Sequence, residues 1–173
     1  KWTLAGGAVI QNSGQKEVKA YGGAAIETLA GGITVNQPMT MFMAAKIDAA
    51  GGASASRFVD AESDHLTSVG IFEQNSLFYA NAGSNKSVGP SDTDPHLHAI
   101  RHNGDASSSY TVSGIGTVTG NIGAENLDAV TLFASISGGS TLTGSMGRLE
   151  LLPKVGDFAV KLIQHQLQRL TKL

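Results

Sequence analysis

One segment of this chain predicts a strand with apolar side chains on both faces. Residues 38–61 read PMTMFMAAKIDAAGGASASRFVDA, which predicts a strand, a Gly-rich turn and a second strand. On the first strand, alternation puts five apolar side chains on one face, namely Met39, Met41, Met43, Ala45 and Ile47. Phe42 and Ala44 fall on the opposite face. A strand buried on both faces lies in the middle of a layered structure. The sequence therefore predicts an all-β sandwich.

Length, charge and cysteine content narrow the class of protein. The 173 residues suffice for one domain with a substantial core, so we expect a single domain over 1–173. The formal net charge is −2 and there is no basic stripe, which argues against a nucleic-acid partner. The absence of cysteine excludes disulfides and thiolate chemistry. No apolar run approaches the length of a membrane span, so we expect no membrane insertion.

Short apolar or alternating segments recur between clusters of Gly, Asn, Ser and Asp, a pattern typical of a sandwich or barrel. We expect strands over residues 2–5, 17–20, 24–29, 39–47, 56–61, 66–72, 76–80, 96–102, 108–112, 115–119, 128–136 and 145–152. Asn103-Gly104 is the strongest hairpin signal, because both residues tolerate positive φ. The longest polar segment, 81–95, predicts either a functional or a mobile loop.

The end of the chain changes to a helical period. Asp157 follows Gly156 and suits a helix N-terminus. An apolar stripe then follows at helical spacing, made of Ala159, Leu162, Ile163, Gln166, Leu167 and Leu170. The sequence predicts a C-terminal α-helix over about 157–171 that packs this stripe on the sandwich. The alternative is an interaction helix for another chain.

The order of these segments resembles a known superfamily. The matching stretches are YGGAAIETLAGG (21–32), QPMTMFMAAKID (37–48), SRFVDA (56–61), SLFYANAG (76–83), PHLHAIRHNGDASSSYTVSG (95–114) and GSMGRLELLPKVGDFAVKLIQHQLQRL (144–170). Together they resemble the concanavalin A-like lectin/glucanase superfamily, in its laminin-G-like jelly-roll branch, over nearly the whole chain. Two positions depart from the family pattern, Pro95 in place of an aromatic residue and Ser113-Gly114 in place of Asp-Gly.

The resemblance implies an antiparallel jelly-roll β-sandwich. Domains of this kind occur as modules of bacterial surface enzymes and of phage tail proteins. By analogy, the resemblance implies a place on a virion, outside the cell or at the cell surface.

Two groups of carboxylates are candidate ligands for Ca²⁺. Asp60, Glu62 and Asp64 form D-x-E-x-D, which could present three hard oxygen ligands from one strand face. The same trio could offer an acid and a nucleophile for glycoside hydrolysis, although the E-x-D-x-x-E of the family's glucanases is absent. The alternative is a solvated turn. Asp92 and Asp94 form the second group, and their alternative role is a bond to their own backbone in a turn.

Three histidines share one face of the strand predicted over 96–102. His96, His98 and His102 contain an H-x-H pair that could ligate a transition metal. No Cys and no H-E-x-x-H pattern supplies further ligands, so hydrogen-bonding histidines are the favoured interpretation.

Two tyrosines are the candidate carbohydrate-stacking residues. Tyr79 and Tyr110 combine a ring with a polar group on strands beside the long loop and the Asn-Gly hairpin. The ring face of tyrosine suits the C–H groups of a sugar. The alternative is packing inside the sandwich with the hydroxyl at its rim.

These observations favour a non-catalytic module that binds a glycan or cell-surface polysaccharide. The expected ligand-binding residues are Tyr79, Tyr110, Asp92 and Asp94, with no catalytic residue and with Ca²⁺ as the candidate ion. One alternative is a structural virion, decoration or oligomerisation domain that contacts its own copies or other virion proteins. Another is a glycoside hydrolase that uses the carboxylates of 60–64.

Overall fold

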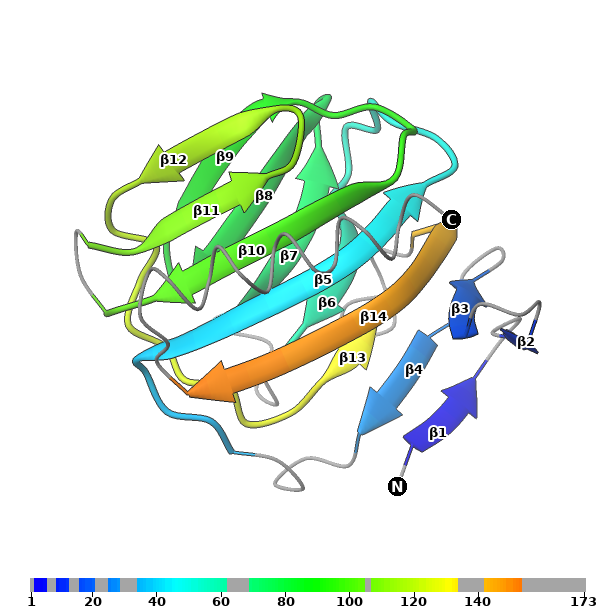
Figure 1. Cartoon of the computed structure of the whole chain (residues 1–173), viewed down its shortest axis with the longest axis horizontal. Coiled ribbons are helices and arrows are strands. Elements are labelled where there is room, and N and C mark those ends of the chain that lie inside the picture. Colours follow the sequence, from blue (N-terminus) through cyan, green and yellow to red (C-terminus); the bar gives the residue numbers. More distant parts are fainter. Residues whose placement is uncertain are drawn as a thin grey trace.

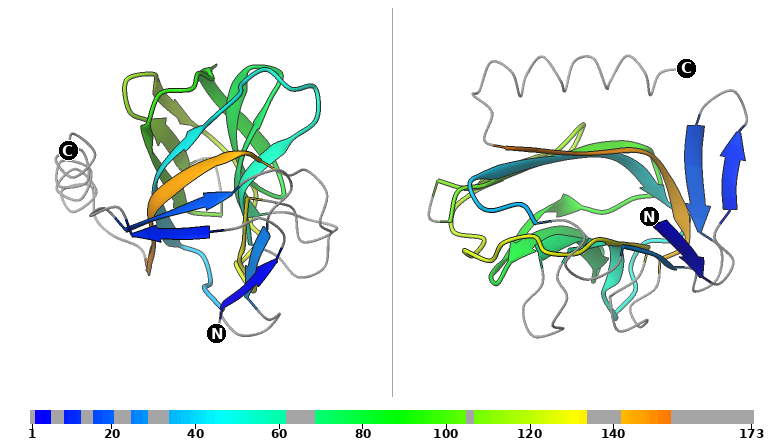
Figure 2. Two further views of the ribbon diagram at one scale, coloured as in Figure 1. Left: turned by 90° about the vertical axis from the view of Figure 1, so that its right-hand side faces the viewer. Right: turned by 90° about the horizontal axis from the view of Figure 1, so that it is seen from below.

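Two antiparallel sheets stacked face to face make up the fold (Figures 1 and 2). The computed structural model describes residues 2–5, 9–12, 16–20, 25–28, 34–61, 69–104, 107–133 and 142–153, with the side chains of 2–28, Arg148 and Pro153 left aside. Within the described residues, each sheet has seven strands. Within these ranges there is no helix, and therefore no helix that could cross a membrane. The all-β sandwich prediction is confirmed.

Each sheet has a simple strand order. Sheet A runs β1 (Trp2–Ala5), β4 (Ala25–Thr28), β13 (Thr131–Leu132), β6 (Ser56–Asp60), β7 (Val69–Gln74), β8 (Leu77–Ala82) and β9 (Asn85–Pro90). Sheet B runs β12 (Gly116–Thr119), β11 (Ser109–Val112), β10 (His96–His102), β5 (Met39–Ile47), β14 (Gly144–Pro153), β3 (Lys16–Ala20) and β2 (Val9–Asn12).

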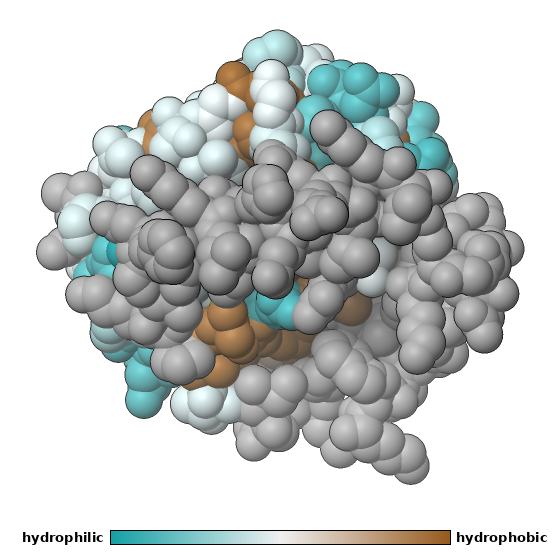
Figure 3. Space-filling view, in the orientation of Figure 1, coloured by the Kyte–Doolittle hydropathy of each residue, from teal (hydrophilic) through white to brown (hydrophobic). Residues whose placement is uncertain are grey.

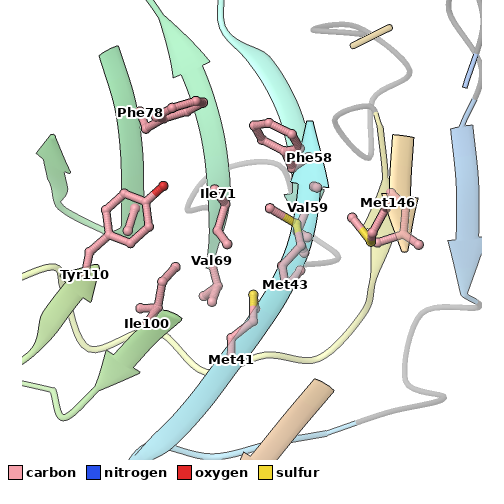
Figure 4. Close-up of a cluster of buried hydrophobic side chains, with 14 of the residues drawn as sticks. Met41, Met43, Phe58, Val59, Val69, Ile71, Phe78, Ile100, Tyr110 and Met146 are labelled. Carbon is pink, nitrogen blue, oxygen red and sulfur yellow. The ribbon is translucent and has the colours of Figure 1, made fainter. Parts of the chain in front are cut away.

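The core lies between the sheets, and β5 is at its centre as its sequence predicts. β5 pairs with β10 on one side and with β14 on the other. Its five inward residues, Met39 to Ile47 in alternation, join the rings and aliphatic side chains of sheet A (Figure 4). Complete burial of one methionine or isoleucine side chain stabilises the fold by about 1.5–3 kcal/mol.

The outer face of sheet B carries a second, smaller apolar cluster. Phe42, Leu97 and Ala99 are buried there, with Leu152 packed beside them. Apolar side chains are visible on this face of the molecule in Figure 3. β5 is therefore buried on both faces. The helix predicted over 157–171 lies outside the described residues and stays a prediction.

Most strand predictions hold. β1, β5 and β10 have the predicted bounds, and every other predicted strand overlaps a strand of the structure. β10 and β11 form the predicted antiparallel hairpin, and Gly104 has a positive φ of 71°. The connection extends over 103–108, however, and is not a two-residue turn.

The prediction of a long loop over 81–95 is wrong. Residues 81–82 end β8, and residues 85–90 form β9, the edge strand of sheet A. Val88 alone of the six β9 residues is buried. An edge strand with a single inward apolar side chain has almost no alternating pattern, and so its sequence resembles a loop.

The strand predicted over 128–136 is also wrong in its extent, because β13 contains two residues. Leu132 and Phe133 both point into the core, and successive residues of a regular strand cannot do this. Phe133 has a φ of +64°, which ends the strand. Residues 134–141 lie outside the described ranges.

Candidate functional site

The outer face of sheet A carries a column of three side chains from adjacent strands, Arg57, Phe72 and Tyr79. Strand register places Arg57 opposite Phe72, and Phe72 opposite Tyr79. The neighbours Phe78 and Ala80 point inward to the core. Alternation along β8 therefore turns Tyr79 away from the core.

The column is held by stacking and by charge. The rings of Phe72 and Tyr79 are nearly parallel, with an interplanar angle of 5° and centroids 4.9 Å apart. On the other side of Phe72, the Arg57 guanidinium carbon lies 5.3 Å from the ring centroid, within the range of a cation–π contact. Arg57 also forms an ion pair with the buried Asp60, at 3.6 Å. Phe72 is thus enclosed, and only 3% of its surface is exposed.

Tyr79 has one ring face against Phe72 and the other directed toward the edge strand β9. Its partner there is Ser87, which is exposed and too small to cover a ring. Tyr79 itself is half-buried. The arrangement therefore offers a fixed aromatic surface with an open side.

The residues flanking Tyr79 on the same face differ in polarity. Toward the β8–β9 turn, Asn81 Nδ2 donates a hydrogen bond of 3.0 Å to Asn85 Oδ1. Toward the opposite end, half-buried Leu77 pairs with exposed Pro90. We call Leu77, Tyr79, Asn81, Asn85, Ser87 and Pro90 the Tyr79 platform.

Tyr110, the second predicted stacking residue, is not at the surface. Its side chain is completely buried between the sheets (Figure 4). Its hydroxyl lies 2.8 Å from His98 Nδ1, and burial raises the pKa of Tyr110 well above its ordinary value. A ring without exposed surface cannot stack on a sugar, so Tyr110 is no part of a surface site.

Asp92 bonds the backbone of its own turn, as its alternative role predicts. Asp92 Oδ1 accepts a hydrogen bond from the Asp94 backbone N–H at 2.8 Å. The same oxygen lies 2.7 Å from His96 Nε2. Burial alone would raise the pKa of Asp92, but the hydrogen bonds from His96 and Asp94 and the charge of His96 hold it below its ordinary value of 3.8. The structure does not bring either aspartate into the Tyr79 platform.

His96 links two loops at one end of the sandwich. Its Nδ1 is 2.8 Å from the Ser113 carbonyl oxygen, and its Nε2 faces Asp92. A carbonyl and an ionised carboxylate only accept hydrogen bonds. Both ring nitrogens of His96 therefore face acceptors, and this residue ties the segment around Asp92 to the Ser113 backbone.

His98 and His102 lie in the core, on the inner face of β10 with His96, as the alternation predicts. Burial, with a contribution from the charge of His96, lowers the pKa of His98 to about 3. Burial lowers the pKa of His102 to about 4. Both are neutral near pH 7. No group of three or more metal-ligating side chains occurs among the residues that the structure describes.

Of the three D-x-E-x-D carboxylates, only Asp60 lies among the described residues. Asp60 ends β6, is 4% exposed and pairs with Arg57. Glu62 and Asp64 lie outside the described residues, so the Ca²⁺ and hydrolase roles of this trio stay predictions. Asp60 has a cation beside it already, which favours a structural role for this carboxylate.

Sequence reasoning missed Glu73, a buried carboxylate at the end of β7. Its Oε1 accepts hydrogen bonds from Gly51 N at 2.9 Å, from Ser76 N at 3.0 Å and from Ser91 Oγ at 3.0 Å. A signal for it was present, because Glu73 has the inward parity of Val69 and Ile71. A charged residue at an inward position of a strand requires partners.

Comparison with solved structures finds this fold in binding domains of botulinum neurotoxins, whereas no family profile and no curated protein matches the sequence significantly. The binding domain of botulinum neurotoxin DC in complex with SialylT matches with a TM-score of 0.67 and 9% identity, over 96% of this chain and 46% of that one. The same domain in complex with rat synaptotagmin II matches with a TM-score of 0.69, 9% identity and the same coverage.

A structure from work on the cell entry of botulinum neurotoxin type C, dependent upon interaction with two ganglioside molecules, also matches. Its TM-score is 0.69 and its identity 9%, over 96% of this chain and 46% of that one. The chain spans about half the length of these binding domains. At this identity the likeness is one of fold, and the chain is an antiparallel β-sandwich of the kind that these neurotoxin binding domains contain.

Proposed function

We propose that this chain is a non-catalytic recognition module that binds a glycan through the Tyr79 platform. One observation carries the proposal. Tyr79 is stacked on Phe72, is half-buried, and is paired across the strands with the small, exposed residue Ser87. Aromatic faces held in this way stack on the apolar face of a pyranose at little entropic cost.

The comparisons lend support by analogy of fold. Structures with this fold include one in complex with SialylT and one linked to gangliosides. We extend the proposal to the concanavalin A-like, laminin-G-like jelly roll suggested by the sequence resemblance. On the same basis we propose that the module belongs to a phage tail, virion or bacterial surface protein, with a cell-surface polysaccharide as its partner.

A glycan array probed with the whole chain and two variants tests this function. Tyr79→Ala removes the stacking surface, and we expect at least a tenfold loss of binding, equivalent to about 1.4 kcal/mol. Tyr79→Phe keeps the ring, and its binding should stay within a few-fold of the original.

Tyr110→Phe is the matched control for Tyr79→Phe, because it removes the hydroxyl from a tyrosine that is buried in the core. Its glycan binding should be unchanged. The proposal fails if no glycan on the array binds, or if Tyr79→Ala binds as well as the unchanged chain while remaining folded by circular dichroism.

A further inference from the structure

The Tyr79 platform has a polarity that should select among sugars. Its six side chains are all uncharged. The exposed Asn85 amide lies at one end and the apolar pair Leu77 and Pro90 at the other. Any sugar stacked on Tyr79 therefore meets hydrogen-bonding groups at one edge and apolar surface at the opposite edge.

The charged residues near the platform do not favour an anionic sugar. Lys86, between Asn85 and Ser87, faces the other way, because its amine lies beside Gly120. Arg57 is separated from Tyr79 by the Phe72 ring and is paired with Asp60.

Two acidic residues lie close to the chain segments that follow β8 and β9. At the β8–β9 turn, the side chain of Glu125 lies beside Gly83. Beyond Pro90, the side chain of Asp92 is 48% exposed and is paired with His96 Nε2 at 2.7 Å. None of the six platform residues is a cation, so a carboxylate stacked there would lose hydration without gaining an ion pair from them.

We infer that the Tyr79 platform selects a neutral pyranose that bears an apolar substituent, such as an N-acetyl methyl group, over an acidic sugar. The pyranose ring stacks on Tyr79 above Ser87, its hydroxyls reach the Asn85 amide, and its apolar substituent contacts Leu77 and Pro90. This inference rests on the proposed function and narrows its ligand to one class.

Three methyl glycosides that share one ring test it: the N-acetylglucosaminide, the glucoside and the glucuronide. Binding to the whole chain is measured by ligand-observed NMR titration. We expect the N-acetylglucosaminide to bind tightest and the glucuronide weakest, with at least a tenfold difference between those two. Glucoside and glucuronide differ only at C6, so their comparison isolates the charge.

Two variants test the two ends of the platform separately. Leu77→Ala should reduce the preference for the N-acetylglucosaminide over the glucoside at least threefold, because it removes an apolar contact to the N-acetyl group. Asn85→Lys adds a cation and should strengthen glucuronide binding relative to glucoside at least threefold. Circular dichroism verifies that each variant is folded.

The outcomes separate this inference from the function on which it rests. Glucuronide binding equal to or tighter than that of the other two, abolished by Tyr79→Ala, overturns the selection of neutral sugars and leaves glycan recognition standing. Equal affinity for glucoside and N-acetylglucosaminide overturns the role of Leu77 and Pro90. No binding of any glycoside, together with an array without hits, overturns both.

Discussion

Inside the sandwich, His98 and Tyr110 form a polar pair enclosed by aromatic rings. The ring centroid of His98 lies 5.2 Å from that of Phe58 and 5.1 Å from that of Phe78. His102 is equally buried on the same strand. The folded chain holds both histidines neutral, whereas the unfolded chain exposes them to water, and this difference couples protonation to folding.

The stability of the fold should therefore fall in mild acid. The lowered pKa values of His98 and His102, about 3 and about 4, compare with an ordinary value of 6.5. The contribution of the neutral histidines to the free energy of unfolding is complete above pH 6.5. It is lost as the pH falls toward the folded-state pKa values, because the unfolded chain binds the protons first. At pH 5 the loss is on the order of 2 kcal/mol for each histidine.

Urea unfolding at pH 7 and pH 5 measures this loss in the unchanged chain and in His98→Gln. Glutamine keeps a hydrogen-bonding partner for Tyr110 but does not titrate. We expect the difference in unfolding free energy between the two pH values to shrink by about half, on the order of 2 kcal/mol. An unchanged difference would show that His98 does not carry this pH dependence.

Among the secondary-structure elements, Glu73 holds together three segments that connect strands. The sheet hydrogen bonds do not link these segments to one another. The hydrogen bonds to its Oε1 come from the β5–β6 turn, the β7–β8 turn and the segment after β9. Asn75 and Ser76 in the β7–β8 turn both have positive φ, as expected in a tight two-residue hairpin. One buried carboxylate thus organises this end of sheet A.

Glu73→Ala should destabilise the chain by about 2–4 kcal/mol, because three donors lose their acceptor at a buried site. Glu73→Gln keeps a carbonyl oxygen that can accept two hydrogen bonds, and should cost roughly half as much. Urea midpoints of the two variants make the comparison. Equal stability of Glu73→Ala and the unchanged chain would contradict the role of Glu73.

The turn that holds β8 depends on a glycine. Gly123 has a φ of +102°, and a Cβ there would lie 1.6 Å from the carbonyl oxygen of Ala82. Gly123→Ala should destabilise the fold by at least about 2 kcal/mol. Gly114→Ala is the matched control, because Gly114 also has a positive φ, +79°, but open space around it.

Only the conformational cost of about 1 kcal/mol should apply at Gly114. Thermal unfolding of both variants compares the two losses of stability. Equal losses would show that the close approach of Gly123 to Ala82 does not cause the destabilisation.

The sequence allows prediction where one strand carries its own pattern. The sequence of β5 predicts that both of its faces are buried, and alternation alone predicts that the histidines of β10 share a face. The column of Arg57, Phe72 and Tyr79 depends on the register of three strands and on a bulge between Arg57 and Val59. Neither can be deduced from one strand. Tyr79 could be proposed from its residue type, but its position beside Phe72 and Ser87 could not.

At the level of the whole molecule, we propose that the predicted helix packs on the outer face of sheet B. Phe42, Leu97 and Ala99 are buried on this face. If the helix over 157–171 packs here, Leu162→Asp with Leu167→Asp should destabilise the chain by about 3 kcal/mol or more, since charges would enter an apolar contact. Lys161→Asp with Gln168→Asp changes the opposite face and should have little effect. Equal effects of the two pairs in urea unfolding would contradict this packing.

If a glycan binds the outer face of sheet A at Tyr79, NMR mapping of the bound sugar should locate it there. Methyl N-acetylglucosaminide titrated into the ¹⁵N-labelled chain should shift the amide signals of Tyr79, Asn81, Asn85 and Ser87. Signals of β5 and β10 should stay in place. Shifts confined to the loop at Asp92 or to sheet B, or no shifts at saturating sugar, would contradict glycan binding at Tyr79.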